Sequence, residues 1–185
     1  MKVKGTVLIS IDRFVKDNFP NKYKEWKGKL PADSQKIYSA PLIATDWYEV
    51  ESGVSIPTKL IGEMFYNFNI KKAAWDSGYY SAKVALTGIY KVFVLISTPA
   101  FIMSRAGKIL SSFYDQAIIK VVDSRSKGIT LHMTEFPGAN EILDNRIAGW
   151  MIKALEICGC KNLESKITKS IAKGDEYTEF VIDWS

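Results

Sequence analysis

The chain has 185 residues, of which 47% are hydrophobic and 24% charged, and its formal net charge is +5 at pH 7. This length and composition are typical of one globular domain and exclude a collagen-like, coiled-coil or disordered chain. The lysines between positions 22 and 29 are interspersed with Glu25 and Trp26, so the positive charge forms no motif for nucleic acid or a membrane surface. The aromatic share of 12% exceeds what a minimal core requires.

The sequence contains few features that indicate a cellular compartment. No run of about 18 or more apolar residues occurs, and Asp12 and Arg13 fall where a signal peptide would remain apolar. Cys158 and Cys160 are too close in sequence to form an ordinary disulfide with each other. We therefore expect a cytoplasmic protein with no membrane span and with free thiols.

The first third of the chain has a helical pattern. Apolar residues recur at steps of three and four over residues 5–19, and a shorter helix is expected over 21–30; a proline follows each segment. Residues 39–55 lack this period and are expected to form a loop or a few short turns. Pro57 suits the first turn of a further helix, which should end at the turn-forming residues 67–69.

A long helical stretch is expected from Lys71 to Ile96, with small residues interleaved among large apolar ones. Two alternatives are open for Gly78 and Gly88: they allow close helix packing, or they make room for a bound molecule. Another helix is expected from Phe101 to Tyr114.

The period then changes to alternation. Short β-branched segments predict strands over 117–122 and 128–133, joined by a loop at 123–128. A clear amphipathic helix over 143–158 follows, and alternating residues between 163 and 184 predict a second hairpin.

The order of these elements predicts an α+β fold in a single domain, residues 1–185. The first 114 residues are mostly helical, and residues 115–185 form a hairpin, a helix and a hairpin. In this fold the N-terminal helical part packs on a four-stranded antiparallel sheet formed by two hairpins flanking one helix.

No constellation in the sequence indicates catalysis. His132 is the single histidine and is expected in mid-strand, without a nucleophile motif. Cys158 and Cys160 have no further ligands nearby for a metal, and no glycine-rich phosphate loop is present. We therefore expect no catalytic residues, no metal site, no cofactor and no enzyme activity.

Two stretches resemble a known superfamily: GYYSAKVALTGIYKVF at Gly78–Phe93 and GCKNLESKITKSIAKGDEYTEFVIDW at Gly159–Trp184. They resemble H-NOX (heme nitric oxide binding) and vinyl-4-reductase-type domains, a superfamily that includes TRAPP subunits of Golgi transport. The chain looks most similar to a heme-lacking bacterial branch. The resemblance covers nearly the whole length, and it implies a helical part over a four-stranded antiparallel sheet.

The chain departs from its heme-binding and cysteine-containing relatives at specific positions. Heme-binding members need a histidine in a helix and a Tyr-x-Ser-x-Arg motif, whereas His132 is expected in a strand and Leu131–Gly138 reads LHMTEFPG. Ser170 and Thr178 stand near the places of the paired cysteines of the vinyl-4-reductase type. These departures from the heme-binding pattern lead us to expect a domain without heme.

Two functional hypotheses follow. The first is a small-molecule-binding or sensor domain whose apolar, aromatic-lined pocket takes an apolar small molecule or an acyl chain. The candidate ligand-binding residues are Trp75, Tyr79, Tyr80, Phe93, Phe101, Phe113 and Tyr114. The alternative for each ring is that it fills the core. The second hypothesis is a TRAPP-like protein–protein interaction or dimerisation module, whose partner is another protein or a second copy.

Overall fold

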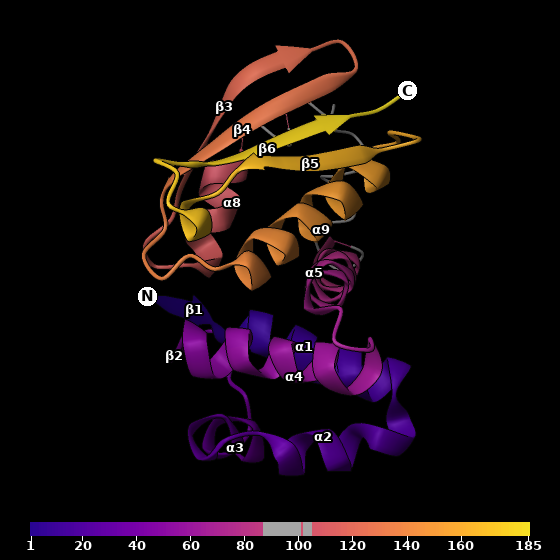
Figure 1. Cartoon of the computed structure of the whole chain (residues 1–185), viewed down its shortest axis with the longest axis vertical. Coiled ribbons are helices and arrows are strands. Elements are labelled where there is room, and N and C mark those ends of the chain that lie inside the picture. The colour runs from indigo at the N-terminus through magenta and orange to yellow at the C-terminus, as the bar shows by residue number, and fades with distance from the viewer. Residues whose placement is uncertain (87–100, 102–104) are drawn as a thin grey trace.

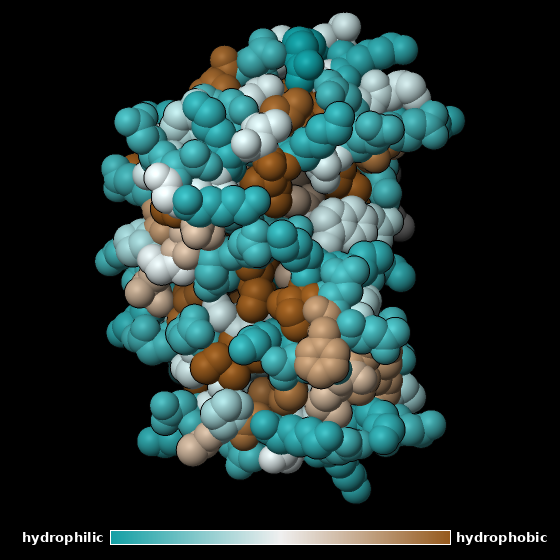
Figure 2. Space-filling model, viewed as in Figure 1, coloured by the Kyte–Doolittle hydropathy of each residue, from teal (hydrophilic) through white to brown (hydrophobic). Residues whose placement is uncertain are grey.

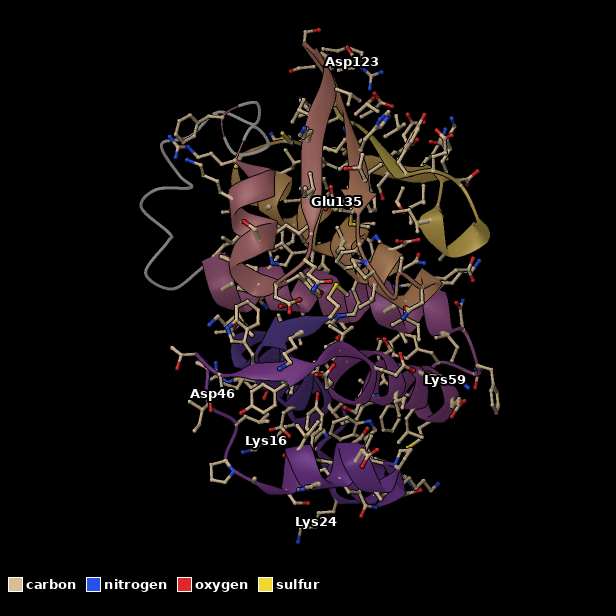
Figure 3. The ribbon with its side chains drawn as sticks, turned by 90° about the vertical axis from the view of Figure 1, so that its left-hand side faces the viewer. Lys16, Lys24, Asp46, Lys59, Asp123 and Glu135 are labelled. Atoms are coloured by element: carbon tan, nitrogen blue, oxygen red, sulfur yellow. The ribbon has the colours of Figure 1, made fainter. Side chains whose placement is uncertain are left out.

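The structure is a computed structural model that describes residues 1–86, 101 and 105–185. Its elements stack in layers, with the four-stranded sheet at one end and the shortest helices of the N-terminal half at the other (Figure 1). The β3–β4 hairpin (Ile118–Arg125 and Gly128–Glu135) reaches one end of the molecule, where Asp123 projects (Figure 3). Lys24, on α2 (Tyr23–Lys29), lies at the opposite end.

The N-terminal half is largely helical, as predicted. Its elements are β1 (Lys2–Lys4), α1 (Gly5–Asn18), the 3-10 turn η1 (Pro20–Lys22), α2, α3 (Ala32–Ser39), β2 (Trp47–Glu49), the π-helical turn η2 (Glu51–Ser55), α4 (Ile56–Phe65) and α5 (Ile70–Leu86). The helices expected over 5–19 and 21–30 and from Pro57 are confirmed. Helix α3 was not predicted. Pro31 follows the end of α2 and is the N-cap of α3, so this proline separates two helices.

The prediction of a loop over residues 39–55 is wrong in part. This segment contains β2, which pairs antiparallel with β1 so that Val3 lies opposite Tyr48. It also contains η2, which runs directly into α4. Because helices α1, α2 and α3 separate β1 from β2 in the sequence, the pairing leaves no local period, and the pattern of this segment alone did not indicate it.

The sheet confirms the α+β class. Its order is β3-β4-β6-β5, with β5 (Glu164–Lys169) and β6 (Thr178–Asp183) forming the second hairpin, and every neighbouring pair is antiparallel. Helix α9 (Glu141–Ile157) connects the two hairpins and lies with α8 (Ala106–Phe113) against one face of the sheet (Figure 1).

Strand ends differ from the prediction. Residues 123–125 belong to β3 rather than to the hairpin loop, and the turn is confined to Ser126 and Lys127. A register shift between Val121 and Asp123 lets the polar end of this edge strand continue the pairing. Residues 163, 171 and 184, expected on the second hairpin's strands, lie just outside them.

One continuous core runs from the N-terminal helices, where Trp26 and Tyr38 are buried, to the sheet, and part of it lies between the sheet and α9. Leu131 and Met133 on β4 are fully buried, while His132 between them faces the other side, which confirms the predicted alternation. Leu143 and Leu155 of α9 are also fully buried and belong to the same core. On the face seen in Figure 2, hydrophilic residues predominate towards the ends and hydrophobic residues gather near the middle.

Two predicted helices are described only in part. Helix α5 accounts for the expected helix from Lys71 as far as Leu86, and the remainder of that prediction lies outside the described residues. The helix expected from Phe101 to Tyr114 is described as α8, and Tyr114 follows its end. Within the described ranges, no helix combines the length and the apolar character needed to cross a membrane.

Candidate functional site

Helices α5 and α9 touch through their backbones. A Cβ atom on Gly78 would lie 2.0 Å from the carbonyl oxygen of Arg146, and one on Gly149 would lie 2.1 Å from that of Trp75. Each glycine therefore makes room for the other helix, so the first of the two alternatives for Gly78 is the one observed. Gly88 lies outside the described residues.

The predicted aromatic residues on α5 point in two directions. Trp75 and Tyr79 stack on each other with centroids 5.2 Å apart, and the Tyr79 hydroxyl donates to Glu156 Oε2 on α9 at 2.5 Å. Tyr80 turns towards the N-terminal half, where its ring meets Phe14 edge-on at 5.5 Å and its hydroxyl donates to Asp17. Trp75 and Tyr79 are thus brought together, and Tyr80 is not.

The remaining predicted residues lie further along the chain. Phe113 meets Trp150 of α9 edge-on at 6.5 Å, and Tyr114 is buried edge-on against Phe136 at 5.2 Å. The side chain of Phe101 is exposed. Phe93 lies outside the described residues, so the complete predicted wall stays a prediction.

A pocket of about 270 Å³ opens between α5, α9 and the β5–β6 hairpin; we call it the α9 pocket. Its lining is mostly polar: Lys71, Trp75, Glu141, Asp144, Asn145, Ala148, Ser165, Ile167, Ser170 and Lys173. Among the residues that the structure describes, Trp75 is the one that this pocket shares with the predicted aromatic set. Trp75, Ala148 and Ile167 supply its apolar wall.

Asp144 is the most unusual residue of the α9 pocket, because its side chain is only 1% exposed. Its Oδ2 accepts a hydrogen bond from the Ser170 hydroxyl at 2.5 Å, whereas its Oδ1 has no partner among the described residues. Burial raises the pKa of this carboxyl, and the hydrogen bond from Ser170 acts in the opposite direction. An ionised carboxylate with one oxygen unsatisfied is a costly feature for a protein interior.

The rim of the α9 pocket carries a small ion-pair network. Glu141 Oε1 lies 2.9 Å from Lys71 Nζ and 3.6 Å from Lys173 Nζ. The hydrogen bond from Lys71 is the main cause that lowers the pKa of Glu141. Three elements therefore meet at this carboxylate: the start of α5, the start of α9 and the 3-10 turn η3 (Ile171–Lys173).

On its other side, α9 carries a buried cation. Arg146 is 3% exposed; its Nη1 donates to Ser77 Oγ on α5 at 2.5 Å, and its Nε has no partner among the described residues. Tyr114 lies beside Arg146, and no ion pair in the described part of the chain includes this arginine. Burial lowers the pKa of its guanidinium group. We call the meeting point of Arg146, Ser77 and Tyr114 the junction.

A second hollow of about 500 Å³ lies beside α1. Several of its lining residues are charged, including Asp12, Arg13, Lys16, Asp17 and Lys27. Asp12 accepts a hydrogen bond from Tyr23 at 2.6 Å and lies 3.9 Å from Lys27. Because Asp12 and Lys27 already have partners, this hollow is a weaker candidate than the α9 pocket.

The fold was compared with known proteins. Neither the protein-family models nor the curated proteins searched gave a match. Among solved structures, an S. oneidensis H-NOX protein in the Fe(II)NO ligation state matches with a TM-score of 0.76 and 12% identity, over 98% of this chain and 99% of that one. Unliganded Fe(II) H-NOX from K. algicida matches at 0.70 and 11%, over 98% and 96%. A mutant of T. tengcongensis H-NOX matches at 0.68 and 8%, over 98% and 97%. The chain therefore has an H-NOX-like fold.

The histidine of this chain does not fit the role of a heme ligand. His132 Nε2 lies 2.6 Å from Glu179 Oε2, and its ring stacks on Tyr177 at 4.0 Å, on the side of the sheet away from α9. The expected position of His132 in mid-strand is thus confirmed. Across the described ranges, no group of three or more His, Cys, Asp or Glu side chains could hold a metal ion.

The sequence patterns did not single out Asp144 and Arg146. Both belong to α9, where they flank the apolar positions Leu143 and Ile147 and pass for the polar edge of an amphipathic helix. Ser170 was noticed only as a departure from a cysteine position. No signal in the sequence of α9 would have revealed them, because the burial of residues beyond its apolar stripe depends on which elements cover the helix.

Proposed function

We propose that this chain is a small-molecule-binding or sensor domain that uses no histidine-ligated heme and takes its ligand in the α9 pocket. The S. oneidensis H-NOX structure, which shares this fold, is in the NO ligation state, so the architecture is compatible with ligand recognition. The lone histidine, engaged by Glu179 and Tyr177, supports recognition without heme.

The observation that carries the proposal is the buried carboxylate of Asp144 in the wall of a pocket. Leaving a buried polar atom unpaired costs about 1–3 kcal/mol, and a ligand that donates a hydrogen bond to it recovers this cost. Buried groups with shifted pKa values in concave sites are typical of ligand-binding positions. The lining favours a ligand with polar groups over a purely apolar molecule or acyl chain.

The proposal assigns binding rather than catalysis to the α9 pocket. Its lining contains neither histidine nor cysteine, and the Ser170 hydroxyl is engaged as a donor to Asp144. A serine that donates to a carboxylate without an intervening base lacks the arrangement of an activated nucleophile.

Native mass spectrometry of the purified protein, before and after denaturation, tests the proposal, together with thermal shifts against a panel of polar and apolar small molecules. We expect a retained adduct or a stabilising compound whose effect is lost in Asp144→Asn and Trp75→Ala. The matched control is Asp33→Asn, which changes an exposed carboxylate of α3. Equal ligand responses in the Asp144 and Asp33 variants would rule out the α9 pocket as the site.

A second candidate function is a dimerisation module, which the exposed side chain of Phe68 favours. This residue is 75% exposed and has a φ of 64°, a conformation that is rare for a bulky residue. Its amide donates to the carbonyl of Gly62 at 3.0 Å, which holds the ring in the turn between α4 and α5. Light scattering over a dilution series should then show a dimer that Phe68→Ser dissociates; a constant monomer mass would exclude this candidate.

A further inference from the structure

We infer that the ligand of the α9 pocket is a small zwitterion of the α-amino-acid type, with an ammonium and a carboxylate group in one molecule. The inference rests on the proposed function and specifies the chemistry of that site. The observation behind it is the separation of charge within the pocket, which is negative at its buried side and positive at its rim.

The buried side of the pocket supplies the acceptor. Asp144 is almost fully enclosed, and its Oδ1 has no partner among the described residues. A charge-assisted hydrogen bond from an ammonium group would satisfy that oxygen. The positive charge of the ligand would also compensate a carboxylate that has no ion pair in the described part of the chain.

The rim supplies the opposite charge. Lys71 and Lys173 share the single carboxylate of Glu141, so these three residues leave one positive charge over. All three are well exposed, which makes their pairing weak and exchangeable. A ligand carboxylate can therefore bind the lysines without breaking a buried interaction.

The spacing of the two charged regions suits one small molecule. Glu141 and Asp144 are separated by three positions on α9 and so lie on the same face, with Cβ atoms about 5–6 Å apart. A volume of about 270 Å³ has room for an amino acid and its side chain. Trp75, Ala148 and Ile167 favour an apolar side chain, which adds burial to the two polar anchors.

One short turn connects both anchors. Ser170, which donates to Asp144, and Lys173, which approaches Glu141, lie three positions apart between β5 and β6. The carboxylate of Asp175 accepts from the Ser170 amide at 2.7 Å, and Gly174 adopts a φ of 93°, so the turn has a defined shape. A zwitterion would contact the two ends of this turn at once.

Isothermal titration calorimetry on the whole chain, at constant ionic strength, tests the inference with glycine, leucine and phenylalanine. Leucine is also compared with its two half-molecules, 3-methylbutan-1-amine and 4-methylpentanoic acid. We expect at least one amino acid to bind, and leucine to bind about tenfold or more tightly than either half-molecule, because each loses one charged anchor.

Substitutions of Asp144 and of the two lysines test the acidic and the basic side of the pocket independently. Asp144→Asn, which keeps an acceptor for Ser170, should weaken binding of the amino acid and of the amine but not of the acid. The double variant Lys71→Met and Lys173→Met should weaken binding of the amino acid and of the acid but not of the amine. Asp33→Asn is the control that should leave all three affinities unchanged, and circular dichroism checks that each variant is folded.

The possible failures are distinguishable. If none of the three amino acids binds while another probe binds in an Asp144-dependent manner, the zwitterion inference is overturned and the proposed function stands. The same holds if the amine or the acid binds as tightly as leucine. If no probe binds and native mass spectrometry shows no adduct, both the inference and the proposed function are overturned.

Discussion

The two sides of α9 bury opposite charges in different surroundings. On one side Asp144 lines an open pocket and accepts a hydrogen bond from a serine of a turn; on the other side Arg146 is enclosed beside Tyr114 and donates a hydrogen bond to Ser77. Only two positions separate these charges, and neither forms an ion pair in the described part of the chain. The comparison teaches that α9 is built with uncompensated charge on both sides, and that only the pocket side is open to a ligand.

The variant that should disturb both sides most is Gly78→Ala. Its new Cβ would meet the Arg146 carbonyl at 2.0 Å, so α5 and α9 must separate. We expect a loss of about 3 kcal/mol in the free energy of unfolding, measured by urea denaturation. The control is Gly28→Ala on α2, where nothing lies within 4 Å; there we expect a gain of about 0.5–1 kcal/mol. Equal stabilities of the two variants would contradict the close contact.

The junction side is probed by comparing Arg146→Ala with Arg146→Met. A buried charge without a counter-ion is replaced at little cost by an apolar side chain of similar length, so the Met variant should be as stable as the wild type or more stable. The Ala variant leaves a cavity and should fall about 2–5 kcal/mol below the Met variant. Thermal and urea unfolding measure both, and a Met variant as unstable as the Ala variant would show that the charge itself holds the junction.

On the pocket side, Asp144→Ala removes the acceptor of the Ser170 hydroxyl. We expect a loss of about 1–3 kcal/mol in the free energy of unfolding, because the buried hydroxyl is left unpaired. Asp144→Asn retains an acceptor and should lose less. Urea denaturation that ranks the Asn variant below the Ala variant would refute this account.

Acidity should affect the pocket side specifically. Because burial raises the pKa of Asp144 in the folded state, folding takes up a proton as the pH falls through that raised value. The difference in unfolding free energy, wild type minus Asp144→Asn, should therefore rise as the pH is lowered from 7 towards about 4, the ordinary pKa of aspartate. Denaturation series at several pH values measure this difference, and a difference that falls with decreasing pH would reverse the sign of the assigned shift.

The smallest effect is expected at the rim. Lys173→Met removes one exposed partner of Glu141 and should change the free energy of unfolding by about 0.5 kcal/mol or less. Added salt should reduce even this difference, because exposed pairs are screened. A loss comparable with that of Asp144→Ala would show that the rim is part of the structural core.

Local patterns predicted most of the fold. Alternation placed Leu131 and Met133 on the inner face of the sheet, and the apolar period of α9 gave its bounds to within two residues. The pairing of β1 with β2 was missed because a three-residue strand carries too short a pattern and its partner is distant in sequence. The end of β3 was missed because polar residues at an exposed edge look like a loop.

The candidate site was much less predictable. The aromatic surplus pointed to large rings, of which Trp75 lines the α9 pocket, while Tyr80 and Tyr114 pack elsewhere. Asp144 and Arg146 carry no local sign of burial, because a charged residue beside an apolar stripe is buried only if other elements cover that side of the helix. That coverage is a property of the assembled fold.

The glycine contact between α5 and α9 has a mechanical consequence. Side chains usually separate the backbones of two packed helices, so that changes of rotamer can accommodate a small tilt of one helix. At Gly78 and Gly149 the two backbones are in direct contact, with no side chain between them. A tilt of α9 must therefore displace α5 and, with it, helices α1 and α4, which α5 contacts. The pair would transmit a movement of the sheet directly to the N-terminal half.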